Sequence, residues 1–183
     1  MRFQNVFVLC TGRCGSVSFA KAASHITNAT SGHETRSHII GSDRMAYPAN
    51  HIETDNRLAW ILGRLDQVYG RDAFYVHLTR DPQAVADSFA ARYDRGIMRA
   101  YAQDIVMGAN KKNPGITPAA LAQDYVDTVT ANITSFLRDK PAKMPFRIEH
   151  AEKSMVRFWR EIGAEGDLSA ACAEWGFRHN ARQ

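Results

Sequence analysis

Short apolar runs alternate with amphipathic segments along the chain, and this pattern predicts strands that take turns with helices. Strands are predicted at about residues 3–9, 28–33, 73–79 and 145–149. Apolar residues at helical spacing predict helices at about residues 16–26, 55–69, 82–94, 117–139, 151–163 and 167–176. Strands and helices in this order form parallel βαβ units whose sheet is covered on both faces. The predicted fold is therefore α/β, a three-layer α/β/α arrangement with a short, mostly parallel central sheet.

The polar segments between these elements predict the loops. Residues 34–52 are rich in Ser, Gly, Asp and Pro and predict a long loop. Residues 96–116 begin with apolar positions at helical spacing and continue as a flexible, polar turn from Gly108 to Gly115. With 183 residues and no internal repeat, residues 1–183 are predicted to form a single domain.

The loop after the first strand has the residues of an anion-binding turn. The apolar run ends in Cys10-Thr11-Gly12-Arg13-Cys14-Gly15-Ser16, and a helical pattern follows it. Glycines let the backbone curl around an oxyanion, and the first amides of the new helix have no partner within the helix. Arg13 adds a fixed positive charge with a planar set of donors. The loop is therefore predicted to bind a phosphate or sulfate group, as in P-loop nucleotide-binding folds.

Several protein families place such a loop after a first strand, and the spacing of the loop residues in each family distinguishes them. A nucleoside-triphosphatase loop has four residues between its glycines and a lysine after the second. Here Gly12 and Gly15 are three positions apart and no lysine follows, which disfavours Mg-ATP. A low-molecular-weight tyrosine phosphatase needs an arginine six positions after its cysteine. Those positions are Ser16 and Ala20, so the phosphatase pattern fails.

The strand at 73–79 ends in a second polar motif, Arg80-Asp81-Pro82. Asp81 suits the helix cap and Pro82 the first helical position. Arg80 thus falls at the carboxyl end of a strand, where open α/β sheets bind ligands. Ser88 lies two turns into the helix on nearly the same side as Asp81. An arginine and a hydroxyl at one helix start suit the binding of a single phosphate.

Both motifs resemble those of sulfotransferases that use 3′-phosphoadenosine 5′-phosphosulfate (PAPS) as donor. The resemblance covers about residues 3–90 and implies that the first loop binds the 5′-phosphosulfate. It implies that Arg80 and Ser88 bind the 3′-phosphate, which distinguishes PAPS from ATP. Arg13 would contact the bridging and sulfuryl oxygens. The implied cofactor-binding residues are Thr11, Gly12, Arg13, Cys14, Gly15, Ser16, Val17, Arg80 and Ser88. This chemistry requires no metal.

A third patch, His33-Glu34-Thr35-Arg36, follows the predicted strand at 28–33. Many bacterial sulfotransferase-like chains carry a His-Glu pair here, and tyrosylprotein sulfotransferases carry acidic residues followed by Thr-Arg. The resemblance implies that Glu34, or else His33, is the base for the acceptor. The catalytic candidates are thus Arg13, Glu34 and His33. The alternatives are an ion pair between Glu34 and Arg36, and a structural histidine that bonds to loop backbone.

The chain also departs from the family pattern. Many members have a second hydroxyl and a tryptophan after the loop glycine, where this chain has Val17 and Ser18. The adenine contacts are therefore not assigned. Residues 178–182 (Arg-His-Asn-Ala-Arg) would be either late nucleotide contacts or a basic tail.

The amino-acid composition limits the classes of binding partner and the cellular compartment that we expect for the protein. The formal net charge of +4 suits an anionic nucleotide, but no dense basic run predicts nucleic-acid binding. Two of the three cysteines lie in the loop, which disfavours a disulfide framework and predicts a cytoplasmic location. No apolar run is long enough to predict a membrane span. The oligomeric state stays open.

The sequence as a whole predicts an enzyme, a PAPS-dependent sulfotransferase that acts on a hydroxyl or amine. The loop at about 37–52 and the segment at about 94–116 would face the acceptor, whose class stays open between carbohydrate, phenol and lipid headgroup. A nucleotide-dependent phosphotransferase and a non-catalytic adenine-nucleotide-binding domain are the alternatives.

Overall fold

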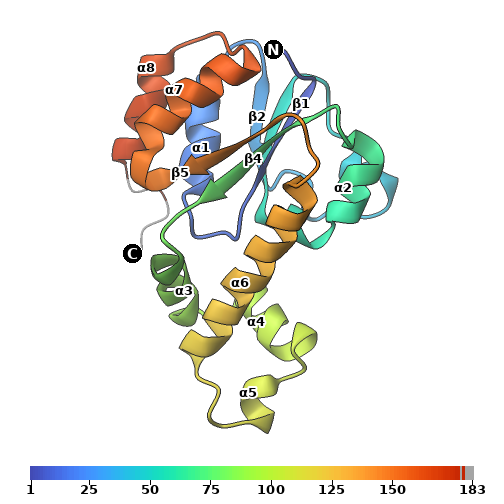
Figure 1. The fold of residues 1–183 in the computed structure, drawn as a ribbon, viewed down its shortest axis with the longest axis vertical. Coiled ribbons are helices and arrows are strands. Elements are labelled where there is room, and N and C mark those ends of the chain that lie inside the picture. Colours follow the sequence, from blue (N-terminus) through green and yellow to red (C-terminus); the bar gives the residue numbers. More distant parts are fainter. Residues whose placement is uncertain (178, 180–183) are drawn as a thin grey trace.

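A computed structural model describes residues 1–177 and residue 179 of the chain. Within these residues, five parallel strands form a sheet in the order β2-β3-β1-β4-β5 (Figure 1). The strands are β1 (Asn5–Leu9), β2 (Thr30–His33), β3 (His51–Thr54), β4 (Phe74–Thr79) and β5 (Lys143–Arg147). Helices cover both sides, which confirms the predicted three-layer α/β/α fold. Because the strands run the same way, the loops after β1, β2 and β4 open at one edge.

The helices of the described residues fall into two layers and an extension. They are α1 (Ser16–Ala23), α2 (Leu62–Tyr69), α3 (Pro82–Ala90), α4 (Gly96–Ala100), α5 (Ala109–Lys112), α6 (Pro118–Leu137), α7 (Ala151–Ile162) and α8 (Leu168–Ala173). In Figure 1, α1, α7 and α8 lie together on one side of the sheet, and α2 lies on the other. The long α6 runs from the sheet along α3 to α4 and α5, beyond the strand ends.

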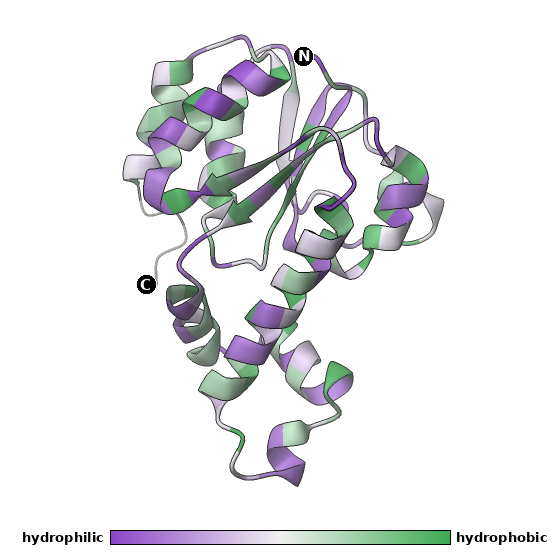
Figure 2. Cartoon of the chain, in the orientation of Figure 1, coloured by the Kyte–Doolittle hydropathy of each residue, from purple (hydrophilic) through white to green (hydrophobic). Residues whose placement is uncertain are grey.

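The core includes an aromatic cluster on each face of the sheet. On one face, Phe19 of α1 packs against Phe146 of β5 and Phe158 of α7, with ring centroids 5.0 and 5.1 Å apart. On the other face, Phe7 of β1 packs against Tyr69 of α2 at 4.6 Å. Residues Val6–Leu9 of the central strand are fully buried. Figure 2 shows the corresponding pattern on α7, where hydrophobic and hydrophilic residues alternate along the helix. Burial of these apolar surfaces fixes β1, and with it the loop that follows β1.

The structure corrects several predicted elements. The predicted 34–52 loop ends in a strand, β3, instead of continuing as a loop. The polar residues of this segment form a strand because they are buried and hydrogen-bonded rather than exposed. The predicted helix at 55–69 is divided into a 3-10 helix, η2 (Asn56–Trp60), and α2. The predicted strand at 145–149 lies two residues earlier, as β5. The segment after Ala100 continues as a π-helical turn, η3 (Tyr101–Ile105), before α5.

The helix start predicted from Asp81 and Pro82 is confirmed, and α6 begins in the same way. The Asp81 side chain accepts a hydrogen bond from the Ala84 amide at 2.8 Å, with Pro82 in the first turn of α3. The Thr117 hydroxyl accepts one from the Ala120 amide at 3.1 Å, with Pro118 in the first turn of α6. No helix within residues 1–177 is long and apolar enough to cross a membrane.

Candidate functional site

The loop between β1 and α1 is a tight, left-handed turn. Gly12, Arg13 and Gly15 have φ angles of 84°, 58° and 87°. Gly15 is the N-cap residue of α1, and no side chain in the described part of the chain caps this end. The residues of the first turn, Ser16, Val17 and Ser18, line a cavity directly in front of the helix. The amides of this turn are therefore available to an anion, as the sequence predicts.

Two loop positions require glycine. A Cβ at Gly12 would lie 2.8 Å from the Asn56 side-chain nitrogen, and one at Gly15 would lie 3.3 Å from Ile148 and Trp175. At both positions, a residue with a side chain would also have to adopt a left-handed backbone conformation, which is costly for L-residues.

We expect Gly12→Ala to lower the free energy of unfolding by about 2 kcal/mol, because strain and a steric clash act together. Chemical denaturation monitored by circular dichroism measures this change. Gly63→Ala is the matched control, because Gly63 lies in α2 and a Cβ there meets no atom within 4 Å. It should leave stability unchanged or raise it by up to about 1 kcal/mol. Equal losses in both variants would contradict the expected strain.

The loop cysteines face the core rather than the cavity. Cys10 and Cys14 are both fully buried, and their thiols interact. The hydrogen bond to Cys14 and burial raise the pKa of Cys10, whereas the same hydrogen bond lowers the pKa of Cys14. The Thr11 carbonyl accepts a hydrogen bond from the Tyr125 hydroxyl at 2.8 Å. Thr11 and Cys14 are thus absent from the cavity wall among the described residues, and they support the loop from behind.

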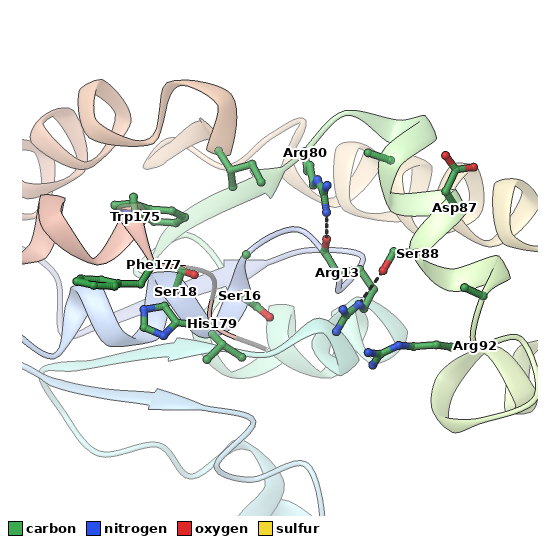
Figure 3. Close-up of a pocket in the computed structure, with 15 residues that line it drawn as sticks. Arg13, Ser16, Ser18, Arg80, Asp87, Ser88, Arg92, Trp175, Phe177 and His179 are labelled. Carbon is green, nitrogen blue, oxygen red and sulfur yellow. Dashed lines mark hydrogen bonds between the residues drawn. The ribbon is translucent and has the colours of Figure 1, made fainter. Parts of the chain in front are cut away.

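The two sequence motifs meet in a cavity of about 830 Å³ (Figure 3). The Arg13 Nε donates a hydrogen bond to the Ser88 Oγ at 3.0 Å, and the Arg80 guanidinium approaches the Arg13 carbonyl at 3.4 Å. Gly15, Ser16 and Val17 line the same cavity.

The topology explains why the motifs meet. Strands β3 and β2 lie on one side of β1, and β4 and β5 lie on the other. The loop after β1 and the loop after β4 therefore open beside each other, at the switch point where α/β sheets bind ligands.

The walls of the larger cavity differ at its two ends. Arg13, Arg80 and Arg92 give one end a positive charge, with Asp87 nearby. In Figure 3, Trp175 and Phe177 lie at the opposite end from Ser88 and Arg92. The Trp175 Nε1 is buried and has no hydrogen-bond partner among the described residues. The cavity thus combines a positively charged end with an aromatic end.

The sequence did not single out Arg92 or Trp175. Arg92 follows Ser88 by one helical turn, which is a weak signal. Trp175 comes from the far end of the chain, and its place in this wall depends on the packing of its ring against Phe146, with centroids 5.1 Å apart. Of the late contacts considered, His179 lines the cavity, while residues 178 and 180–182 lie outside the described residues.

A smaller cavity of about 350 Å³ adjoins the larger one. The two share Arg13, Ser16, Val17 and Arg92. His33 and Glu34 line the smaller cavity, and the His33 Nε2 lies 3.0 Å from the Ser16 Oγ. Gly12 also lines this cavity. The predicted catalytic residues Arg13, His33 and Glu34 therefore all line the smaller cavity, and Arg13 lines the larger one as well.

The backbone around Glu34 is held in place by buried carboxylates of the β3 region. Glu53 is fully buried and accepts hydrogen bonds from the Thr35 amide at 2.8 Å and the Thr35 hydroxyl at 2.6 Å. Asp55, also fully buried, accepts one from the Ser37 hydroxyl at 2.9 Å. These bonds hold the turn that places Glu34 at a φ of 55°.

Glu34 forms its ion pair with a residue other than the expected one. Its carboxylate lies 2.5 Å from the Arg57 Nη1, whereas Arg36 donates to the Asp43 carbonyl. The alternative of a Glu34–Arg36 pair is therefore wrong. His33 likewise bonds to a side chain, Ser16, rather than to loop backbone. The reason in both cases is that the turn after β2 faces η2 and the β1–α1 loop.

Comparison with known proteins assigns neither a family nor a function to the chain. No family model and no curated protein matches the sequence. The two motifs and the geometry of the two cavities are therefore what indicates a function. Within residues 1–177 and residue 179, no group of three or more His, Cys, Asp and Glu side chains is placed to hold a metal ion.

Chemically, the site can bind a strongly anionic ligand that carries an aromatic group. Guanidinium groups and helix amides bind phosphate or sulfate oxygens through charge-assisted hydrogen bonds. The larger cavity volume of about 830 Å³ lies within the range of small-molecule sites. The shared wall at Arg13 and Ser16 places such a ligand's anionic end beside His33 and Glu34 in the smaller cavity.

Proposed function

We propose that the chain is a sulfotransferase that moves the sulfuryl group of PAPS to a hydroxyl or amine acceptor. The observation that supports this most strongly is the contact between Arg13 and Ser88. It joins the two motifs that resemble the 5′-phosphosulfate loop and the 3′-phosphate site, and it does so in the wall of one cavity with Arg80.

The residues present fit PAPS. The amides at the start of α1 and the Ser16 hydroxyl suit the 5′-phosphosulfate, while Arg80 and Ser88 lie where a 3′-phosphate would need a cation and a donor. At the aromatic end, the face of Trp175 suits an adenine ring.

PAPS supplies a sulfuryl group that passes to the acceptor by in-line displacement, so the protein must mainly position the partners and stabilise charge. Arg13 lies in the wall shared by the two cavities, between the nucleotide side and the acceptor side. Its guanidinium would stabilise the charge that develops on the bridging oxygen. The larger cavity would hold the nucleotide and the smaller one the acceptor.

The two base candidates have different surroundings. The Glu34 carboxylate pairs with Arg57 at 2.5 Å, so one of its oxygens is directed to the guanidinium. The His33 Nε2 bonds to Ser16 at the junction of the cavities. His33 therefore lies closer to the expected transfer point, and Glu34 lines the acceptor side.

We expect His33→Asn and Glu34→Gln to separate these roles. Substitution of the true base should lower the turnover of PAPS by about a hundredfold or more, since general base catalysis typically contributes that much. Both variants should retain the affinity for 3′-phosphoadenosine 5′-phosphate (PAP), because neither residue lines the nucleotide cavity. Turnover is measured as the PAP formed from PAPS with the same acceptor for each variant. Full turnover in both would contradict a base at this position.

A further inference from the structure

The smaller cavity carries more positive charge than the transfer chemistry requires. Its lining includes Arg57, Arg92 and Arg95 in addition to the shared Arg13. Glu34 is the only carboxylate among the described residues that line it, and Arg57 already pairs with that carboxylate. The remaining arginines give this cavity a net positive charge.

Two of these arginines have no strong protein partner. Arg92 is half-buried, and no carboxylate of the described residues lies within ion-pair distance of it. Arg95 approaches Asp94 at 3.5 Å, but both side chains are mostly exposed, and such surface pairs contribute little. A guanidinium in a cavity wall suits a carboxylate or sulfate, which it binds through two parallel hydrogen bonds.

The positively charged arginines extend beyond the cavity that would hold the nucleotide. Arg80 lines only the larger cavity, Arg92 lines both, and Arg95 lines only the smaller one. Arg95 therefore belongs to the acceptor side. Phe89 and Ile97 line the same space and provide apolar contact beside the charges.

We propose that the acceptor carries an anionic group, a carboxylate or a sulfate, besides its reacting hydroxyl. Arg92 and Arg95 bind this group, and Phe89 and Ile97 contact the carbon frame, so that the hydroxyl faces His33. The proposal rests on the proposed function and narrows its acceptor class to anionic compounds.

Matched probe pairs test this in equilibrium titrations by ligand-observed NMR, with the protein saturated by PAP. One pair is methyl β-D-glucuronide and methyl β-D-glucoside, and the other is 4-hydroxyphenylacetate and its amide. At least one charged probe should bind about tenfold or more tightly than its neutral partner, as expected for a charge-assisted hydrogen bond. The pair that responds shows whether the frame is a sugar or a phenol. Equal binding within both pairs would overturn the proposal.

Variants locate the bound anion. Arg95→Met should abolish the preference for the charged probe, whereas Arg99→Met should preserve it. Arg99 is an exposed arginine of α4 and lines neither cavity. If instead Arg80→Met removes the preference and Arg95→Met does not, the anion occupies the nucleotide cavity and the proposal is wrong.

The design also separates this proposal from the proposed function. If PAP does not bind, the sulfotransferase assignment fails. The probe titrations are then run on nucleotide-free protein, where the comparison of Arg95→Met with Arg80→Met still shows which cavity binds the anion.

Discussion

Arg13→Ala is expected to lower the turnover of PAPS by about a hundredfold or more, the usual loss when a well-placed charge-stabilising donor is removed. Arg13 lies in the wall shared by both cavities and hydrogen-bonds to Ser88 at 3.0 Å. Removing its side chain takes away a positive charge at the expected position of the transferred group. Turnover is measured as PAP formed from PAPS with one acceptor under single-turnover conditions.

The control for this prediction is Arg99→Ala, which removes an arginine outside both cavities. Arg13→Lys adds a second comparison, because it retains the charge but loses the planar set of donors, and an enzyme should still lose rate. A domain that only binds the nucleotide would tolerate this change. Wild-type turnover in Arg13→Ala, with an intact fold, would show that the catalytic assignment is wrong.

Arg80→Ala is expected to weaken PAP binding by about tenfold or more, the loss typical of a hydrogen bond to a charged group. Binding of AMP, which lacks the 3′-phosphate, should change little. The preference for PAP over AMP is therefore the quantity to follow by calorimetry. Because Arg80 is exposed, the loss should shrink at high salt.

The three possible outcomes of that experiment have different meanings. A selective loss of PAP binding supports the assignment of Arg80 to the 3′-phosphate. An equal loss for PAP and AMP would mean that Arg80 acts through the loop, since its guanidinium approaches the Arg13 carbonyl at 3.4 Å. Retained PAP affinity would show that the 3′-phosphate binds elsewhere.

The sequence predicts the local features of the site well. The glycines around Arg13 and the Asp81-Pro82 cap have conformational preferences of their own, so they mark the loop and the start of α3 before the fold is known. The apolar runs of β1 and β4 are similarly clear. The meeting of Arg13 with Ser88 follows once these two strands are neighbours in a parallel sheet.

Structural features that depend on residues far apart in the chain could not be predicted from the sequence. His51 and Glu53 look like loop residues, yet they form a buried strand because His51 and Thr35 satisfy the Glu53 carboxylate. Trp175 and Arg95 line the cavities only because distant segments fold against the strand ends. The inward orientation of Cys14 is likewise a consequence of packing, because a loop sequence does not show which side chains face the core.

Calorimetric titration with PAP, performed beside ATP with and without magnesium, shows directly whether the larger cavity binds the PAPS nucleotide. A PAPS-dependent sulfotransferase should bind PAP tightly and ATP weakly, and the weak binding of ATP should not depend on magnesium. Tight binding of Mg-ATP would instead favour a phosphotransferase. Binding of neither nucleotide would contradict the claim that the larger cavity is a PAPS site.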